Sequence, residues 1–337
     1  MNPEYDADIV ILALERVEET LAAIRSALAQ TGITRRVIVV DQGSAPDTIA
    51  RLEHEIGGRA DATLVRLGRN HGVGGGRNIG AGLGHGRIIA ALDNDAEFAT
   101  PDTLARAVAA LDTEADLAAV GMRIIEYDTG RDDLLSWGYP TSLLARAGER
   151  FATVTFVGAG HAIRRAAWAQ AGGYDESLRF TWEEYDFCLR AIELGWRIAY
   201  RGDLVVRHKV SAERRFQWSG ERWFHFVRNR IVIERKWAAS WPSLAPRIGG
   251  YLVRGARAGL LRQTIRAVVA AAHIEPANPR RLSPQARAYL RANDGAHRGT
   301  LPERIRREVL AALPGRSTSR AIRSRSSSAK TGGLSTR

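Results

Sequence analysis

The chain has 337 residues, of which 45% are hydrophobic, and a formal net charge of +12; this length can bury one large core or two modest ones. Its single cysteine, Cys188, excludes intramolecular disulfides and multi-cysteine zinc sites, and it favours a reducing compartment. We find no stretch of about 20 apolar residues and no basic-then-apolar secretory signal. We therefore expect a cytoplasmic protein that does not span a membrane.

The positive charge is concentrated in the C-terminal part of the chain. Residues 241–337 contain 19 Lys+Arg and 4 Asp+Glu, whereas the first 240 residues contain 30 and 33. We expect three parts: a main domain over residues 1–238, a helical arginine-rich extension over 239–315, and a disordered low-complexity tail over 316–337. The extension is either a peripheral contact for anionic lipid headgroups on the inner membrane face or a solvated helical addition.

Short apolar runs and helical segments alternate along the main domain. Strands are predicted at 8–14, 37–40, 64–67, 87–92 and 119–125, with helices at 16–30, from Pro46, and from Thr100-Pro101 to 111. Further along, strands are predicted at 154–157, 197–200 and 204–208, and helices at 165–171, 183–194, 217–237 and through much of 241–313. The alternation predicts an α/β fold with a mostly parallel sheet flanked by helices. Ligands of such sheets bind beyond the carboxyl ends of the strands.

Acidic residues follow two of these strands. Asp93 and Asp95, separated by Asn94, come directly after the strand that ends at residue 92, and their carboxylates could hold one Mg²⁺ or Mn²⁺ beside a diphosphate. The alternative is a solvated turn, because Asp and Asn favour turns. Asp41 follows the strand 37–40 and could accept hydrogen bonds from a nucleobase or ribose; alternatively it caps the next helix, although Ser44 could do so equally well.

A glycine-rich segment covers residues 70–86 and includes Arg77. Its glycines would allow close approach to a ligand, and the Arg77 guanidinium could bind phosphate or base oxygens. The alternative is a flexible loop that leads into a glycine-tolerant helix. The dinucleotide-binding pattern G-x-G-x-x-G fits in no register, which disfavours a Rossmann dehydrogenase.

Three acids crowd the start of the predicted helix 183–194: Glu183, Glu184 and Asp186. One of them could remove a proton from an acceptor hydroxyl. The structural alternative is a capping box formed by Thr181 and Glu184. His208 ends an apolar strand and matters for chemistry only if the fold carries it back to Asp95; otherwise it is a packed or surface residue.

Taken in order, the segments VIVVDQGS, NHGVGGGRNIG, ALDNDAEF, the GAG turn, GGYDESLRFTWEEYDFCLR and GWRIAYRGDLVVRH resemble family 2 glycosyltransferases with the GT-A fold, over residues 8–237. The resemblance implies an inverting, nucleotide-sugar-dependent hexosyl or deoxyhexosyl transferase. It also implies a saccharide or lipid-linked acceptor and work in cell-surface polysaccharide or glycolipid synthesis.

The resemblance also implies a role for individual residues. Nucleotide contacts fall on Asp41, Arg77, Asn78 and Asp93. The DxD motif corresponds to Asp93 and Asp95, which with His208 would bind Mg²⁺ or Mn²⁺. Glu184 stands where the family usually has the Asp that acts as base, with Glu183 and Asp186 as its neighbouring acids and Trp182 against a sugar ring.

Two other functions compete with this interpretation. A sugar nucleotidyltransferase needs a glycine-rich basic loop straight after the first strand, and ALERVEE offers none. A non-catalytic basic protein that binds nucleic acid would explain the arginine-rich end, but it leaves the acids at the strand ends unexplained. Nucleic acid is therefore not the expected partner.

Overall fold

The N-terminal half of the sheet is parallel. The computed structural model describes residues 5–209, 220–310 and 313, so the predicted disordered tail lies outside the described residues. Neighbouring strands in this half follow the order β3-β2-β1-β4. Their bounds are β1 (Ala7–Ala13), β2 (Arg35–Asp41), β3 (Ala62–Arg66) and β4 (Ile88–Leu92). These apolar runs are almost wholly buried at β1, β2 and β4, as expected for strands covered on both faces.

The rest of the sheet mixes strand directions. The order continues β8-β6-β9-β5, and β7 pairs with β9. Only β6 and β9 pair in parallel here, whereas β8, β5 and β7 run antiparallel to their neighbours. The bounds are β5 (Ala96–Phe98), β6 (Leu117–Glu126), β7 (Arg150–Thr153), β8 (Gly160–Arg164) and β9 (Arg197–His208). The predicted α/β fold is confirmed, but the sheet is mixed rather than mostly parallel, because four of the eight strand pairings among the described residues are antiparallel.

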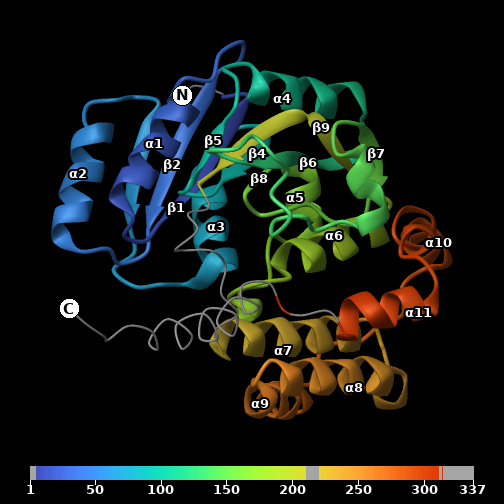
Figure 1. Cartoon of the computed structure of the whole chain (residues 1–337). Coiled ribbons are helices and arrows are strands. Elements are labelled where there is room, and N and C mark those ends of the chain that lie inside the picture. The colour runs from blue at the N-terminus through green and yellow to red at the C-terminus, as the bar shows by residue number, and fades with distance from the viewer. Residues whose placement is uncertain (1–4, 210–219, 311–312, 314–337) are drawn as a thin grey trace, which may run out of the picture.

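Helices cover the sheet (Figure 1). Those of the main domain are α1 (Val17–Leu28), α2 (Pro46–Ile56), α3 (Gly72–Leu83), α4 (Thr103–Thr113), α5 (Arg165–Ala171) and α6 (Glu183–Glu193). The largest core cluster joins β1, β2, β4 and β6 to α1 and α4. α2 begins at Pro46, as the sequence predicts, because the fixed backbone of proline suits the first helical turn.

The prediction of a strand at 154–157 is wrong. This segment is irregular, yet Val154 and Phe156 are buried in a core with Phe187. A buried irregular run has the same composition as a short strand, so the sequence alone does not separate them. The strand lies just before it, at β7, and a second strand, β8, begins at Gly160.

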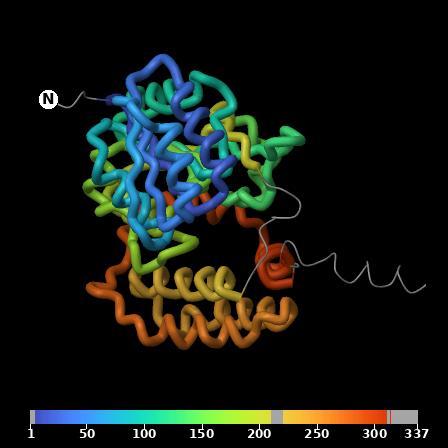
Figure 2. Tube along the Cα trace, turned by 90° about the vertical axis from the view of Figure 1, so that its left-hand side faces the viewer, coloured from blue at the N-terminus to red at the C-terminus, as the bar shows by residue number. Residues whose placement is uncertain are grey.

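The C-terminal helices are α7 (Gly220–Lys236), α8 (Trp241–Arg257), α9 (Leu261–Ala272), α10 (Pro284–Asn293) and α11 (Leu301–Arg304). Helices α7, α8 and α9 form a layer beside the main domain, whereas α10 packs against α6 in the core of the main domain. In both views α8 and α9 lie at the outer edge, with α7 between them and the sheet (Figures 1 and 2). Trp223 of α7 and Leu244 of α8 belong to one core with Ala267 of α9, so the predicted boundary at 238 falls inside that core. No helix among the described residues is long and apolar enough to cross a membrane.

Candidate active site

Strand register brings the predicted metal ligands together. Asp93 and Asp95 follow β4, and the antiparallel pairing of β5 with β9 sets Ala96 opposite His208. His208 Nε2 therefore lies 3.2 Å from Asp95 Oδ1. Asp93, Asp95 and His208 offer ligand atoms that all lie within 4.8 Å of one another. We call these three residues the Asp–Asp–His cluster.

A buried aspartate that the sequence analysis missed orients His208. Asp133 follows β6, and its Oδ2 lies 2.9 Å from His208 Nδ1 and accepts a hydrogen bond from Ser136 Oγ at 2.6 Å. The Asp133 carboxylate binds Nδ1 and leaves Nε2 facing Asp95. A carboxylate on the second ring nitrogen is the usual support of a metal-binding histidine. Burial by itself lowers the pKa of His208, but its hydrogen bonds to Asp133 and Asp95 outweigh burial and raise the pKa to about 10.

Arg16, also missed from the sequence, reaches the cluster from the end of β1. Its Nη1 donates to Asp95 Oδ2 at 2.6 Å. Burial raises the pKa of Asp95, but hydrogen bonds from His208 and Arg16 lower it to about 2. Glu15 and Arg16 both adopt left-handed backbone, with φ of 53° and 52°. Such backbone is costly for residues other than glycine and concentrates at functional sites.

Arg77 links the cluster to the acids of α6. Its side chain is 4% exposed, and its nitrogens contact Glu184 Oε1 at 2.9 Å, Asp93 Oδ1 at 2.9 Å and the Gly158 carbonyl at 2.8 Å. The guanidinium fork is thus engaged by two carboxylates and a carbonyl. The structure therefore favours a bridge between acids over the diphosphate or base contact predicted for Arg77.

The glycines of residues 72–83 serve packing. This segment is helix α3, and a Cβ at Gly76 would lie 2.8 Å from Leu12 Cδ2, while one at Gly80 would lie 2.5 Å from Val10 Cγ1. Only glycine lets α3 approach the sheet this closely. The prediction that the glycines admit a ligand is thus not supported, and the alternative of a glycine-tolerant helix describes the segment.

Two predicted nucleotide contacts are occupied by hydrogen bonds within the protein. Asn78 donates to the Tyr174 carbonyl and accepts from the Tyr174 amide, each at 2.9 Å, which clamps α3 to the segment before α6. Asp41 is fully buried and accepts from the amides of Gly43 at 3.1 Å and Ser44 at 3.2 Å. Neither Asp41 nor Ser44 caps α2, so the capping alternative is wrong.

The acidic side chains at the start of α6 have different neighbours. Glu184 contacts Arg77, whereas Asp186 is fully buried and pairs with Arg190 and Lys236, each at 2.9 Å. The structure gives Asp186 a structural role in place of the predicted catalytic one. Burial, with the charge of Glu184 beside it, raises the pKa of Glu183 to about 8.

The predicted capping box is absent. The residue before α6 is Trp182, which makes no side-chain cap, and Thr181 Oγ1 is buried without a hydrogen-bond partner among the described residues. Thr181 and Trp182 are both left-handed, with φ of 66° and 72°. The helix start that carries Glu184 is thus held in a costly backbone conformation.

Helix α7 holds this conformation in place. The Asn229 amide is fully buried and donates to the carbonyls of Leu178 at 2.7 Å and Phe180 at 2.9 Å. Trp182 Nε1 donates to the Phe226 carbonyl at 2.9 Å, and Arg230 lies 4.9 Å from the Trp182 ring. The Trp182 ring is therefore engaged by α7, which does not favour the predicted contact with a sugar.

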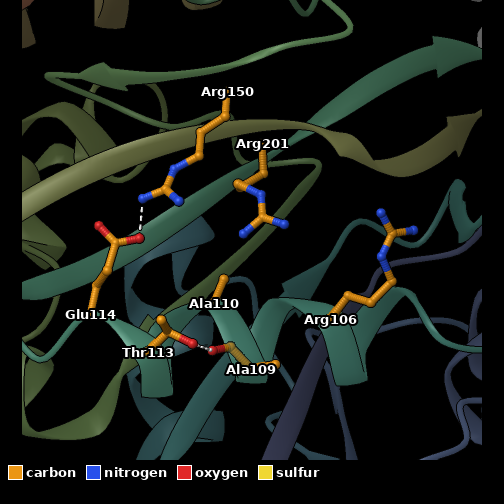
Figure 3. Close-up of a pocket in the computed structure, with 7 residues that line it drawn as sticks. All are labelled: Arg106, Ala109, Ala110, Thr113, Glu114, Arg150 and Arg201. Carbon is orange, nitrogen blue, oxygen red and sulfur yellow. Dashed lines mark hydrogen bonds and ion pairs between the residues drawn. The ribbon is translucent and has the colours of Figure 1, made fainter.

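A separate cavity of about 270 Å³ lies between α4 and strands β7 and β9 (Figure 3). Three arginines line it, and all are already paired: Arg106 and Arg201 with Asp203, and Arg150 with Glu114. None of the lining residues belongs to the Asp–Asp–His cluster. This cavity is therefore not the candidate active site.

Comparison with known proteins agrees with the fold. Residues 8–172 match the model of the family described as "Glycosyl transferase family 2". Over these residues the chain is similar to this family. Solved structures of similar fold include a mannosyltransferase from Pyrobaculum calidifontis in complex with GDP-Man and Mn²⁺, at TM-score 0.55 and 18% identity, covering 90% of this chain and 83% of that one. GalNAc-T7 with UDP, GalNAc and Mn²⁺ aligns at TM-score 0.56 and 15% identity, covering 80% and 55%. The predicted family and the GT-A fold are confirmed.

Family 2 relatives extend the comparison. Succinoglycan biosynthesis protein ExoO of Rhizobium meliloti is 38% identical over 134 residues, which cover 38% of each chain. Glucosyl-dolichyl phosphate glucuronosyltransferase of Haloferax volcanii is 26% identical over 222 residues, which cover 61% of this chain and 69% of that protein. The chain therefore matches little more than a third of the length of ExoO.

Proposed function

We propose that this chain is an inverting glycosyltransferase. It moves a sugar from a nucleoside-diphosphate sugar to a hydroxyl group of a saccharide or lipid-linked acceptor during polysaccharide or glycolipid synthesis. The observation that carries the proposal is the network in which Arg77 joins Glu184, the candidate base, to Asp93 of the Asp–Asp–His cluster. The relatives named for succinoglycan and for a dolichyl phosphate sugar support this choice of acceptor class.

The Asp–Asp–His cluster would hold a divalent cation, Mn²⁺ or Mg²⁺. Two carboxylates and an imidazole form a donor set that suits these metals, and Asp133 orients the imidazole as such sites require. The side chain of Asp93 is 40% exposed, which leaves its oxygens open to a ligand. A cation bound there would neutralise the charge of the departing diphosphate.

Glu184 acts as the general base. The acceptor oxygen attacks the anomeric carbon on the face opposite the diphosphate, the bond from that carbon to the diphosphate oxygen breaks, and the hydroxyl proton passes to Glu184. Burial raises the pKa of Glu184, and the charge of Arg77 offsets only part of this rise. The raised pKa makes the Glu184 carboxylate a stronger base for removing the acceptor proton. With its pKa near 8, Glu183 is largely neutral at pH 7, so two adjacent charges are avoided.

Thermal unfolding tests the donor and the metal together. We expect one of UDP-, dTDP- or GDP-sugars to raise Tm, and the rise to require Mn²⁺, because a ligand that binds only the folded chain stabilises it. Hydrolysis of the same donor to free sugar and nucleoside diphosphate is the second measurement. If no donor raises Tm with or without Mn²⁺ and none is hydrolysed, the proposal fails.

Gly158→Ala should separate Arg77 from Glu184. A Cβ at Gly158 would lie 2.5 Å from Glu184 Oε1 and 3.3 Å from the Arg77 terminal nitrogens, so both side chains must move. We expect kcat for transfer to fall about 100-fold, since small displacements of catalytic groups have effects of this size. The matched control is Gly82→Ala, where nothing lies within 4 Å. Equal kcat values for the two variants would contradict the role of the network.

A further inference from the structure

Exposed apolar side chains gather on the C-terminal helices. Of the fourteen large hydrophobic residues that are exposed in the described part of the chain, eight lie between Trp241 and Leu310. Scattered exposed apolar residues are normal, but a local concentration marks a surface that meets another molecule or a membrane. The C-terminal layer therefore differs from the rest of the surface.

On α9 these residues form a stripe. Leu261, Ile265 and Val269 are spaced four residues apart and are 42%, 49% and 50% exposed. The residues of α9 that face the protein are different ones: Thr264 and Ala267 are buried against the rest of the layer. The helix thus keeps a stripe of half-exposed apolar side chains, and α9 itself lies at the outer edge of the molecule (Figures 1 and 2).

The charge on these two helices is of one sign. Residues 241–272, which include α8 and α9, contain five arginines and no Asp or Glu. Arg262 lies beside the stripe and has no hydrogen-bond or ion-pair partner within the described part of the chain. An apolar stripe flanked by arginines suits an anionic lipid surface, where the apolar side chains enter the headgroup boundary and the arginines meet phosphate.

We propose that the stripe of Leu261, Ile265 and Val269, with Arg262 beside it, docks the protein on a bilayer of anionic phospholipid. Charge favours this occupant over a second copy of the chain, because α8 and α9 carry five arginines and no acid. Arg247 and Arg266 pair with Glu234 and Glu221 of α7, and the pair of helices remains net positive. Docking of this kind is interfacial and does not need a spanning helix. It would bring the proposed transferase to a lipid-linked acceptor, but it does not depend on that activity.

Vesicle co-sedimentation of the full chain tests the proposal, with phosphatidylcholine vesicles that contain or lack phosphatidylglycerol. We expect binding only when phosphatidylglycerol is present, and weaker binding as salt rises. The double variant I265S/V269S should lower the partition coefficient about tenfold, since two half-exposed apolar side chains are lost. R262Q should lower it about fivefold, which is the usual contribution of one arginine near such a surface.

The matched control is L83S/L194S, which removes two side chains of similar exposure (43% and 48%) from the main domain. It should bind vesicles as the unchanged chain does. Equal loss in both double variants would overturn the proposal, as would no binding of the unchanged chain, or a dimer in solution that I265S/V269S abolishes. Donor hydrolysis without vesicles should be the same in I265S/V269S and the unchanged chain, so failure of docking and failure of the transferase are distinguished.

Discussion

We expect Glu184→Gln to reduce sugar transfer about a thousandfold and to leave donor binding near that of the unchanged chain. The substitution keeps the size of the side chain and an oxygen that can accept from Arg77, which lies 2.9 Å from Glu184 in the unchanged protein. It removes the basicity that takes the acceptor proton, and general bases contribute about 10²- to 10⁴-fold. The measurements are kcat for transfer and the donor-induced rise in Tm.

The neighbouring Glu183→Gln is the control for this prediction. Because the pKa of Glu183 is about 8, its carboxyl is already mostly neutral at pH 7, and the variant should retain most of its activity. In the unchanged chain, kcat should fall as the pH drops through the raised pKa of Glu184, because only the carboxylate accepts a proton. Normal turnover by Glu184→Gln together with an inactive Glu183→Gln would move the base to Glu183.

Asp95→Asn should remove the dependence of donor binding on metal. Asp95 faces both His208 and Arg16, and the amide replaces one anionic oxygen by a nitrogen that cannot bind a cation. We expect Mn²⁺ to bind at least about 100-fold more weakly, and the Mn²⁺-dependent rise in Tm with donor to disappear. A second variant, Asp133→Asn, should weaken Mn²⁺ binding about 10- to 100-fold through the orientation of His208.

Mn²⁺ titration by calorimetry measures both effects. The matched control is Asp116→Asn, an aspartate with a 59% exposed side chain that pairs with Arg197 outside the cluster. It should bind Mn²⁺ like the unchanged chain. If Asp95→Asn kept the full Mn²⁺ dependence of donor binding, the Asp–Asp–His cluster would not be the metal site.

Residues at strand ends were the most predictable part of the site. Asp93 and Asp95 both follow one continuous apolar strand. Ligands of such sheets bind beyond the carboxyl ends of the strands, so the sequence places these two acids where a ligand is expected. His208 was predicted to be a ligand only if the fold brought it close to Asp95. The antiparallel pairing of β5 with β9 does bring it there. A strand of only three residues, such as β5, leaves too short a pattern to be predicted.

The residues that the sequence analysis missed act over long separations. Arg16 meets Asp95 across 79 positions, Asp133 meets His208 across 75, and Asn229 meets Leu178 across 51. Such contacts depend on tertiary packing, which no local pattern records. Gly76 and Gly80 were noticed in the sequence but interpreted wrongly. A glycine permits close approach of either a ligand or a neighbouring strand, and composition alone does not distinguish the two.

Helix α7 joins two regions that the sequence analysis assigned to separate domains. Through Asn229 it fixes the backbone that aims Glu184, and through the bond from Trp223 Nε1 to Thr264 Oγ1, at 2.8 Å, it is anchored to α9. A single helix therefore contacts both the outer helix of the proposed docking surface and the backbone segment that leads to the candidate base.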